Sequence, residues 1–253
     1  MMLNIRISLK KLTLWGVFCC LLFMTGCVYL RLLTLKNQLK DFDNHFTTKV
    51  DDGFILHFKT PMLYSDDVLY LSKVEPTNRE LQPDQEYWTF HFRKERVEES
   101  DEGADLIFEM IFDTRKNLMT DFKLSPVFLE IIPPRFLELS LRSLGSAKVD
   151  KKNRQLTVAK FQIRKEDMTL PDKEKVLQKL GSPKETHQKE EYTELIYHYK
   201  LDQFTPDPKD KERGLAVTTL RFDKQTHELL YARCKFAGLK ISIDYSKWKN
   251  YLI

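Results

Sequence analysis

The sequence predicts an α+β fold built from two similar units, each a short helix followed by an antiparallel β-meander. Three observations favour this organisation. Aromatic and polar residues alternate in several short segments, which is the pattern of half-buried strands. The two halves of the chain align at a constant offset of 107 residues. An apolar segment at 126–144 joins them, and Pro133 and Pro134 within it predict two short helices that meet there.

The first unit is expected to span residues 44–165. It opens with a hairpin around the turn Asp51-Asp52-Gly53, because short alternating segments flank these turn residues. Ser65 is expected to cap a short helix that Pro76 stops, and a polar loop follows at 77–85. Strands are then expected at 87–93, 106–112, 118–124 and, after the helical segment, 156–163.

The second unit is expected to span residues 166–253. Asp172 is the predicted N-cap of its helix and Gly181 the residue that ends it, just before Pro183. Strands are expected at 195–201, 215–223, 229–236 and 239–245, with an exposed loop at 202–213.

The alignment of the halves runs without a gap from Ser65 to Arg93. It pairs Pro76 with Pro183, and Phe90-His91-Phe92 with Tyr197-His198-Tyr199. Each meander has one face to bury, and the helix of the unit would cover it. A duplication explains this match. The alternative is that two unrelated meanders share aromatic strands and Asp-containing turns.

The second unit resembles the small lipoproteins of the β-barrel assembly machinery (the SmpA/OmlA type). That family shows a helix, a Leu-Gly-x-Pro turn, a Tyr-rich strand and a final hairpin with Phe-Asp. The matching residues here are Leu180, Gly181, Pro183, Tyr197, Tyr199, Phe222, Asp223 and Leu229. A tandem version of the unit is found in the β-lactamase inhibitory protein, whose concave sheet grips another protein. The resemblance therefore implies protein binding in the bacterial envelope.

The N-terminus has the layout of a bacterial lipoprotein signal peptide at residues 1–26. A basic start is followed by an uncharged apolar run at 12–24 and then by Thr25-Gly26-Cys27. The segment Met24–Cys27 resembles the lipobox, so Cys27 is expected to carry the lipid after cleavage. Because Val28 is not acidic, we expect the lipoprotein in the outer membrane, facing the periplasm. The alternative is an uncleaved inner-membrane anchor at 12–33 with the same body.

Residues 27–43 are expected to form the lipidated anchor and a short amphipathic helix. Leu32, Leu35 and Leu39 share one helical face. We expect this face to pack on the body, and contact with the membrane is the alternative.

Composition excludes several classes of protein. The net charge is +4, but Arg6, Lys10 and Lys11 would leave with the signal peptide, so the body is nearly neutral. No nucleic-acid partner is expected, since that needs a concentrated basic face. Of the four cysteines only Cys234 lies in the body. A single cysteine forms no internal disulfide and no thiolate zinc cluster.

No catalytic, cofactor or metal residues are predicted. The six histidines show no helical metal-ligand spacing, and no phosphate loop or nucleophile elbow is present. His91 and His198 occupy equivalent strand positions and are expected to face away from the core. The candidate partner surface of a non-catalytic interaction module is either the sheet face that carries His91 and His198 or the pair of helices that meets at Pro133-Pro134. The alternative function is a carrier of lipid or another hydrophobic ligand, formed by 126–144 and a curved sheet.

Overall fold

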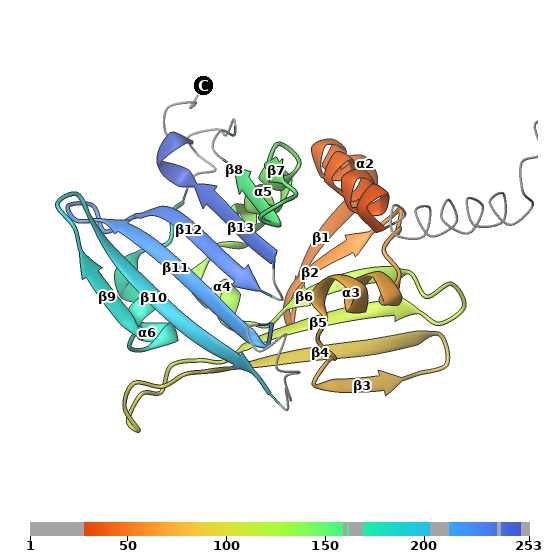
Figure 1. Ribbon diagram of the computed structural model, residues 1–253, viewed down its shortest axis with the longest axis horizontal. Helices are drawn as coiled ribbons and strands as arrows, with labels where there is room; N and C mark the ends of the chain where they lie inside the picture. Colours follow the sequence, from red (N-terminus) through yellow and green to blue (C-terminus); the bar gives the residue numbers. More distant parts are fainter. Residues whose placement is uncertain (1–27, 159–160, 162–168, 203–212, 237–238, 249–253) are drawn as a thin grey trace, which may run out of the picture.

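The protein is a mixed helix and sheet structure in which one large, mostly antiparallel sheet dominates (Figure 1). The computed structural model describes residues 28–158, 161, 169–202, 213–236 and 239–248. The α+β class is therefore confirmed. The expected signal peptide, Cys27 and most of the expected loop at 202–213 lie outside the described residues.

The described part of the chain begins with a helix at residues 28–38. A 3-10 turn η1 (Leu39–Asp41) and the short α2 (Phe42–His45) lead into the hairpin of β1 (Phe46–Asp51) and β2 (Gly53–Phe58). The hairpin was predicted, and Gly53 makes its turn with a positive φ of 108°. As expected, Leu32 and Leu35 of the 28–38 helix and Leu39 of η1 pack on the core.

The first helix, α3 (Ser65–Ser72), starts one residue away from its predicted cap. Tyr64 occupies the N-cap position and Ser65 is already helical. The reason is the carboxylate of Asp67, which accepts the backbone N–H of Tyr64 at 2.9 Å. This back-reaching acid fixes the first turn in place of the serine hydroxyl.

A meander follows α3, made of β4 (Gln85–Lys94), β5 (Leu106–Asp113) and β6 (Met119–Leu124). All three strands were predicted. The expected loop at 77–85 is wrong in part, because it contains β3 (Asn78–Leu81), which pairs antiparallel with β4. All four residues of β3 are exposed, so no alternation of apolar residues predicts the strand. Backbone pairing with β4 stabilises it instead.

Two helices meet at the prolines as predicted: α4 (Val127–Ile131) and α5 (Pro134–Leu144). Pro134 stands at the first position of α5, where its missing N–H costs nothing. Gly145 ends α5. The chain continues in β7 (Lys148–Asp150), which was not predicted, and β8 (Gln155–Val158); the rest of the expected strand at 156–163 lies almost wholly outside the described residues.

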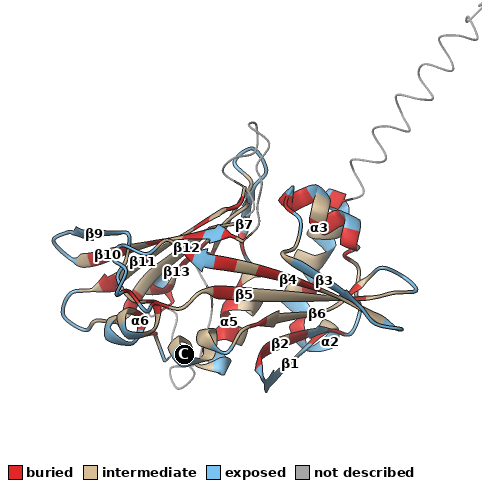
Figure 2. Ribbon diagram, turned by 90° about the horizontal axis from the view of Figure 1, so that it is seen from below, coloured by how far each residue is buried: buried red, intermediate tan, exposed pale blue. Residues whose placement is uncertain are grey.

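The second half contains α6 (Lys173–Leu180), capped by Asp172, whose carboxylate accepts the N–H groups of Glu174 and Lys175. Gly181 ends the helix as predicted, with a φ of +67° that residues with a side chain rarely adopt. The strands are β9 (Glu185–Gln188), β10 (Tyr192–Leu201), β11 (Leu215–Asp223), β12 (Leu229–Phe236) and β13 (Leu239–Asp244), and the turn η3 (Tyr245–Lys247) ends the described part. Only β9 was missed, and like β3 it is fully exposed (Figure 2).

The strands of the described residues join into one 13-stranded network through the pairing of β4 with β10. The order along it is β1-β2-β6-β5-β4-β10-β11-β12-β13-β8-β7, and only β8 and β13 run parallel. Phe236 of β12 lies 5.1 Å from Phe92 of β4 and 5.5 Å from Phe108 of β5, between ring centroids. The sheet therefore curls, with one face turned inward around the core.

We call this the inner face. It carries the largest buried residues of the two central strands, each at most 2% exposed: Trp88, Phe90, Phe92, Leu195, Tyr197 and Tyr199. The opposite, outer face carries the alternate residues, which are half-buried or exposed. Burial on one side and partial exposure on the other follow from the alternation of side chains along a strand.

Candidate functional site

The junction of β4 and β10 places the two predicted histidines on the same outer face. Three residue pairs define the junction, with Arg93 opposite Lys200 at its centre. Two backbone hydrogen bonds flank them: Glu95 N–H donates to the His198 carbonyl, and Asp202 N–H to the His91 carbonyl, both at 2.8 Å. His91 and His198 thus lie at opposite ends of one short strand pairing.

His91 lies between two carboxylates. Its Nε2 is 2.9 Å from Asp105 and its Nδ1 is 3.8 Å from Asp202. Asp105 also accepts the backbone N–H of Lys94 at 2.8 Å, and Arg93 donates to Asp202 at 2.8 Å. The side chain of His91 is therefore held in place by its neighbours and not free in solvent.

His198 has a similar but looser environment. Its Nδ1 is 3.5 Å from the Glu95 carboxylate, which also lies 3.8 Å from the Lys184 ammonium. The outer face of the junction, which we call the junction patch, consists of His91, Arg93, Glu95, His198, Lys200 and Asp202. Its charges nearly balance, and partly exposed ion pairs of this kind contribute little to stability. They are suited to setting the specificity and orientation of a contact.

The two prolines do not join this patch. Phe128 of α4 contacts Phe108 at 5.5 Å between ring centroids, and Phe108 contacts Phe92 at 5.9 Å. The helix α4 therefore lies on the inner face, and Pro133 and Pro134 follow it directly. The sheet therefore separates His91 and His198 from Pro133 and Pro134, and the two predicted partner surfaces lie on opposite faces.

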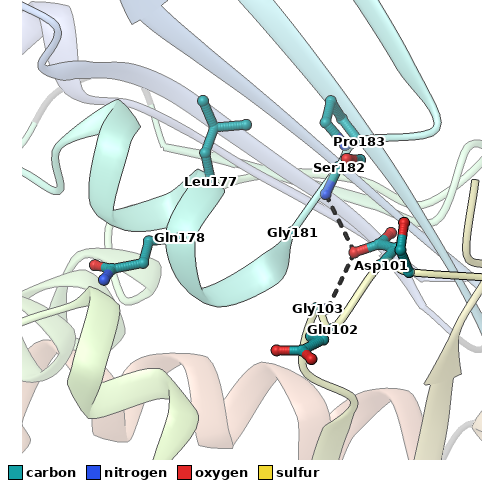
Figure 3. Close-up of a pocket in the computed structure, with 9 residues that line it drawn as sticks. Asp101, Glu102, Gly103, Leu177, Gln178, Gly181, Ser182 and Pro183 are labelled. Atoms are coloured by element: carbon teal, nitrogen blue, oxygen red, sulfur yellow. Dashed lines mark hydrogen bonds between the residues drawn. The ribbon is translucent and has the colours of Figure 1, made fainter. Parts of the chain in front are cut away.

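A second group of polar residues is buried beneath the junction. Lys94, the inner-face neighbour of Arg93, pairs with Asp101 at 2.5 Å, and both side chains are at most 2% exposed. Asp101 also accepts the N–H groups of Gly103 at 3.0 Å and Ser182 at 3.3 Å (Figure 3). Burial alone would raise the pKa of Asp101, but the hydrogen bond from Lys94 and those of the two amides bring it below its ordinary value.

This pair ties the β4–β5 loop to the end of α6. The Gly103 α-carbon sits against the backbone of Leu180, where a β-carbon would lie 2.1 Å from the carbonyl oxygen. An open hollow of about 330 Å³ forms beside the contact and is lined mostly by small and polar residues: Ser100, Asp101, Glu102, Gly103, Leu177, Gln178, Gly181, Ser182 and Pro183. We interpret Lys94 and Asp101 as a structural clamp that holds the loop, because their charges are already satisfied.

Sequence reasoning missed Glu95, Asp202 and Asp105 as neighbours of the histidines, and it missed the clamp. Glu95 and Asp202 could have been found from the sequence, since they are acids related by the 107-residue offset, two residues beyond the end of the aligned segment. Nothing in the local sequence marks Lys94 or Asp101 as buried.

The described residues contain no group of three or more His, Cys, Asp or Glu side chains arranged to hold a metal ion. Among the described residues, no helix is long and apolar enough to cross a membrane. Burial raises the pKa of the Cys234 thiol, which lowers its reactivity. No family model, curated protein or solved structure matches this chain.

Proposed function

We propose that this chain is a lipid-anchored envelope protein whose body is a non-catalytic protein-interaction module. The observation that carries the proposal is the junction patch: an exposed to half-buried sheet face on which charged side chains are held in fixed positions by their neighbours. Fixed, partly exposed charges lower the entropy lost on binding and select a partner of complementary charge. Half-buried Ile107, Ile196 and Val217 on the same face add apolar area to it.

We also propose that the two meanders are copies of one unit. The strands β3 and β9 begin and end 107 residues apart, and so do β4 and β10. At the junction, the offset relates Lys94 to Leu201 and Tyr199 to Phe92. The observed pair Lys94–Tyr199 therefore corresponds to the other observed pair, Leu201–Phe92, and Arg93 lies opposite its own counterpart Lys200. A shared origin accounts for this symmetry. The two halves then correspond in how their strands pair as well as in their sequence.

The partner is tested by photo-crosslinking in intact cells. A photoreactive amino acid is placed at Lys200 in the junction patch or, as a control, at the similarly exposed Val149 of β7. We expect a discrete protein adduct from position 200 only. The substitution Lys200→Glu should leave the fold intact, because it faces Arg93, and should weaken co-purification of that partner at least several-fold. Equal adducts at both positions, or none, would count against an interaction module.

The anchor is tested by the substitution Cys27→Ala, metabolic palmitate labelling and membrane fractionation. We expect the wild-type chain to be labelled, cleaved and found in the outer membrane. The variant should be unlabelled and should keep residues 1–26, because cleavage follows lipid transfer. A wild-type chain that is unlabelled, full length and in the inner membrane would instead favour the uncleaved anchor at 12–33.

A further inference from the structure

We propose that an exposed apolar stripe on the 28–38 helix lies in the membrane surface and sets the orientation of the body on the bilayer. This inference rests on the membrane anchoring proposed above. The stripe consists of Tyr29, Leu30 and Leu33, which are 49%, 64% and 50% exposed. Leu33 is four positions after Tyr29 and three after Leu30, so the three side chains form one patch along the helix.

The opposite side of the same helix packs on the body. Val28 is buried, and Leu32 and Leu35 contact the core. The helix is thus apolar on two sides, of which the body covers one. Because a contiguous exposed apolar patch commonly marks a site of contact with a protein or a membrane, the stripe indicates an interaction surface.

The helix cannot turn to hide the stripe without breaking specific contacts. Arg31 donates through Nε to the buried carboxylate of Asp67 at 2.7 Å, and its guanidinium lies 5.0 Å from the ring centre of Tyr64. At the other end, Gln38 donates to the backbone oxygen of Thr60 at 3.1 Å. The direction in which the stripe faces is therefore fixed relative to the body.

The sequence around the helix identifies a lipid surface as the occupant. Residue 27, the expected lipid-bearing cysteine, is two positions from Tyr29, so the anchor brings the bilayer to the stripe. Arg31 is paired with Asp67, but Lys36 and Lys40 remain, and the chain carries no acid between residues 28 and 40, which favours contact with anionic headgroups. Tyrosine and leucine beside basic residues are typical of helices that lie in the interface, about 5–10 Å deep.

The test uses the full-length chain in intact cells with p-benzoylphenylalanine at Leu30 or at Leu33. The control carries the same probe at Val97, a 49% exposed residue in the β4–β5 loop. Figure 1 shows this loop at the end of the molecule away from the 28–38 helix. After irradiation with radiolabelled phospholipid present, we expect lipid adducts at positions 30 and 33 at least five times as abundant as at position 97.

Each outcome decides between the two proposals. A chain that fractionates with the membrane but gives no excess of lipid adducts at 30 and 33 overturns the stripe and leaves the anchor intact. Protein adducts in place of lipid adducts at these positions do the same. A chain recovered outside the membrane fraction overturns the anchor, and the stripe with it. An unchanged unfolding midpoint of each labelled chain verifies that the probe has not disturbed the fold.

Discussion

The buried pair of Lys94 and Asp101 gives the most direct test of how the sheet and α6 are joined. In the variant Lys94→Met, the Asp101 carboxylate keeps only the N–H groups of Gly103 and Ser182. Both charged side chains are at most 2% exposed, so water cannot replace the lost partner without opening the contact. We expect the free energy of unfolding to fall by about 3–5 kcal/mol, the usual cost of leaving one partner of a buried pair alone.

The assay is urea unfolding of the full chain in detergent, followed by the fluorescence of Trp88 and Trp248, which are both buried. The double variant Lys94→Met/Asp101→Asn removes both charges. It should be more stable than the sum of the single changes predicts by about 1 kcal/mol or more, because the two side chains are in contact. The control Arg115→Ala breaks an exposed pair with Asp84 and should change stability by less than about 1 kcal/mol.

The pair also predicts a dependence on pH. The pKa of Asp101 is lowered in the folded protein from its ordinary value of 3.8. The contribution of this carboxylate is therefore fully present above the unfolded pKa and is lost as pH falls through the folded pKa. The gap in stability between wild type and Lys94→Met should be constant near neutral pH and shrink below about pH 4. A variant as stable as the wild type at pH 7, or a gap that widens in acid, would refute the reasoning.

Further changes around the same region have defined outcomes in the same unfolding assay. Tyr199 is fully buried and its hydroxyl has no hydrogen-bond partner among the described residues, so Tyr199→Phe should leave stability unchanged or raise it by up to about 1 kcal/mol. Its matched control is Tyr197→Phe, which removes the hydrogen bond to the Gly181 carbonyl and should lower the free energy of unfolding by about 1 kcal/mol. A larger loss of stability in Tyr199→Phe than in Tyr197→Phe would contradict these hydrogen-bond assignments. Gly181→Ala should destabilise by more than about 1 kcal/mol, because φ is +67° and a β-carbon would lie 2.0 Å from the Asp101 carboxylate; a neutral effect would mean that this turn is not under the constraint described.

The buried aromatic strands were predictable from sequence because alternation records burial on one face. Phe90 and Phe92 alternate with polar residues, and the strand they predict is present with its expected inner face. The helix ends at Asp172 and Gly181 were predictable for a local reason as well, since caps depend on residues within one turn. The break at Pro133-Pro134 follows from the same local chemistry.

Features that depend on pairing across the chain were not predictable in this way. The short strands β3 and β9 have no buried residue and exist through hydrogen bonds to β4 and β10. The curl of the sheet, which brings Phe236 against Phe92, depends on the geometry of several strands at once. For the candidate site, the alternation of residues predicted that His91 and His198 share one face. Nothing in the local sequence indicates on which side of the sheet α4 and Pro133-Pro134 would pack.

The position of Arg93 opposite Lys200 has a consequence for the proposed interaction, because it determines what a partner seated on the junction patch would contact. In a symmetric homodimer of a single unit, the residue on the axis would face itself, and both sides of the axis would present identical surfaces to two partners. Here both sides belong to one polypeptide and differ: His91 has Asp105 and Asp202 beside it, whereas His198 has Glu95. A molecule seated across the axis therefore meets two different sides, and one copy bound in a single orientation is the stoichiometry this geometry favours.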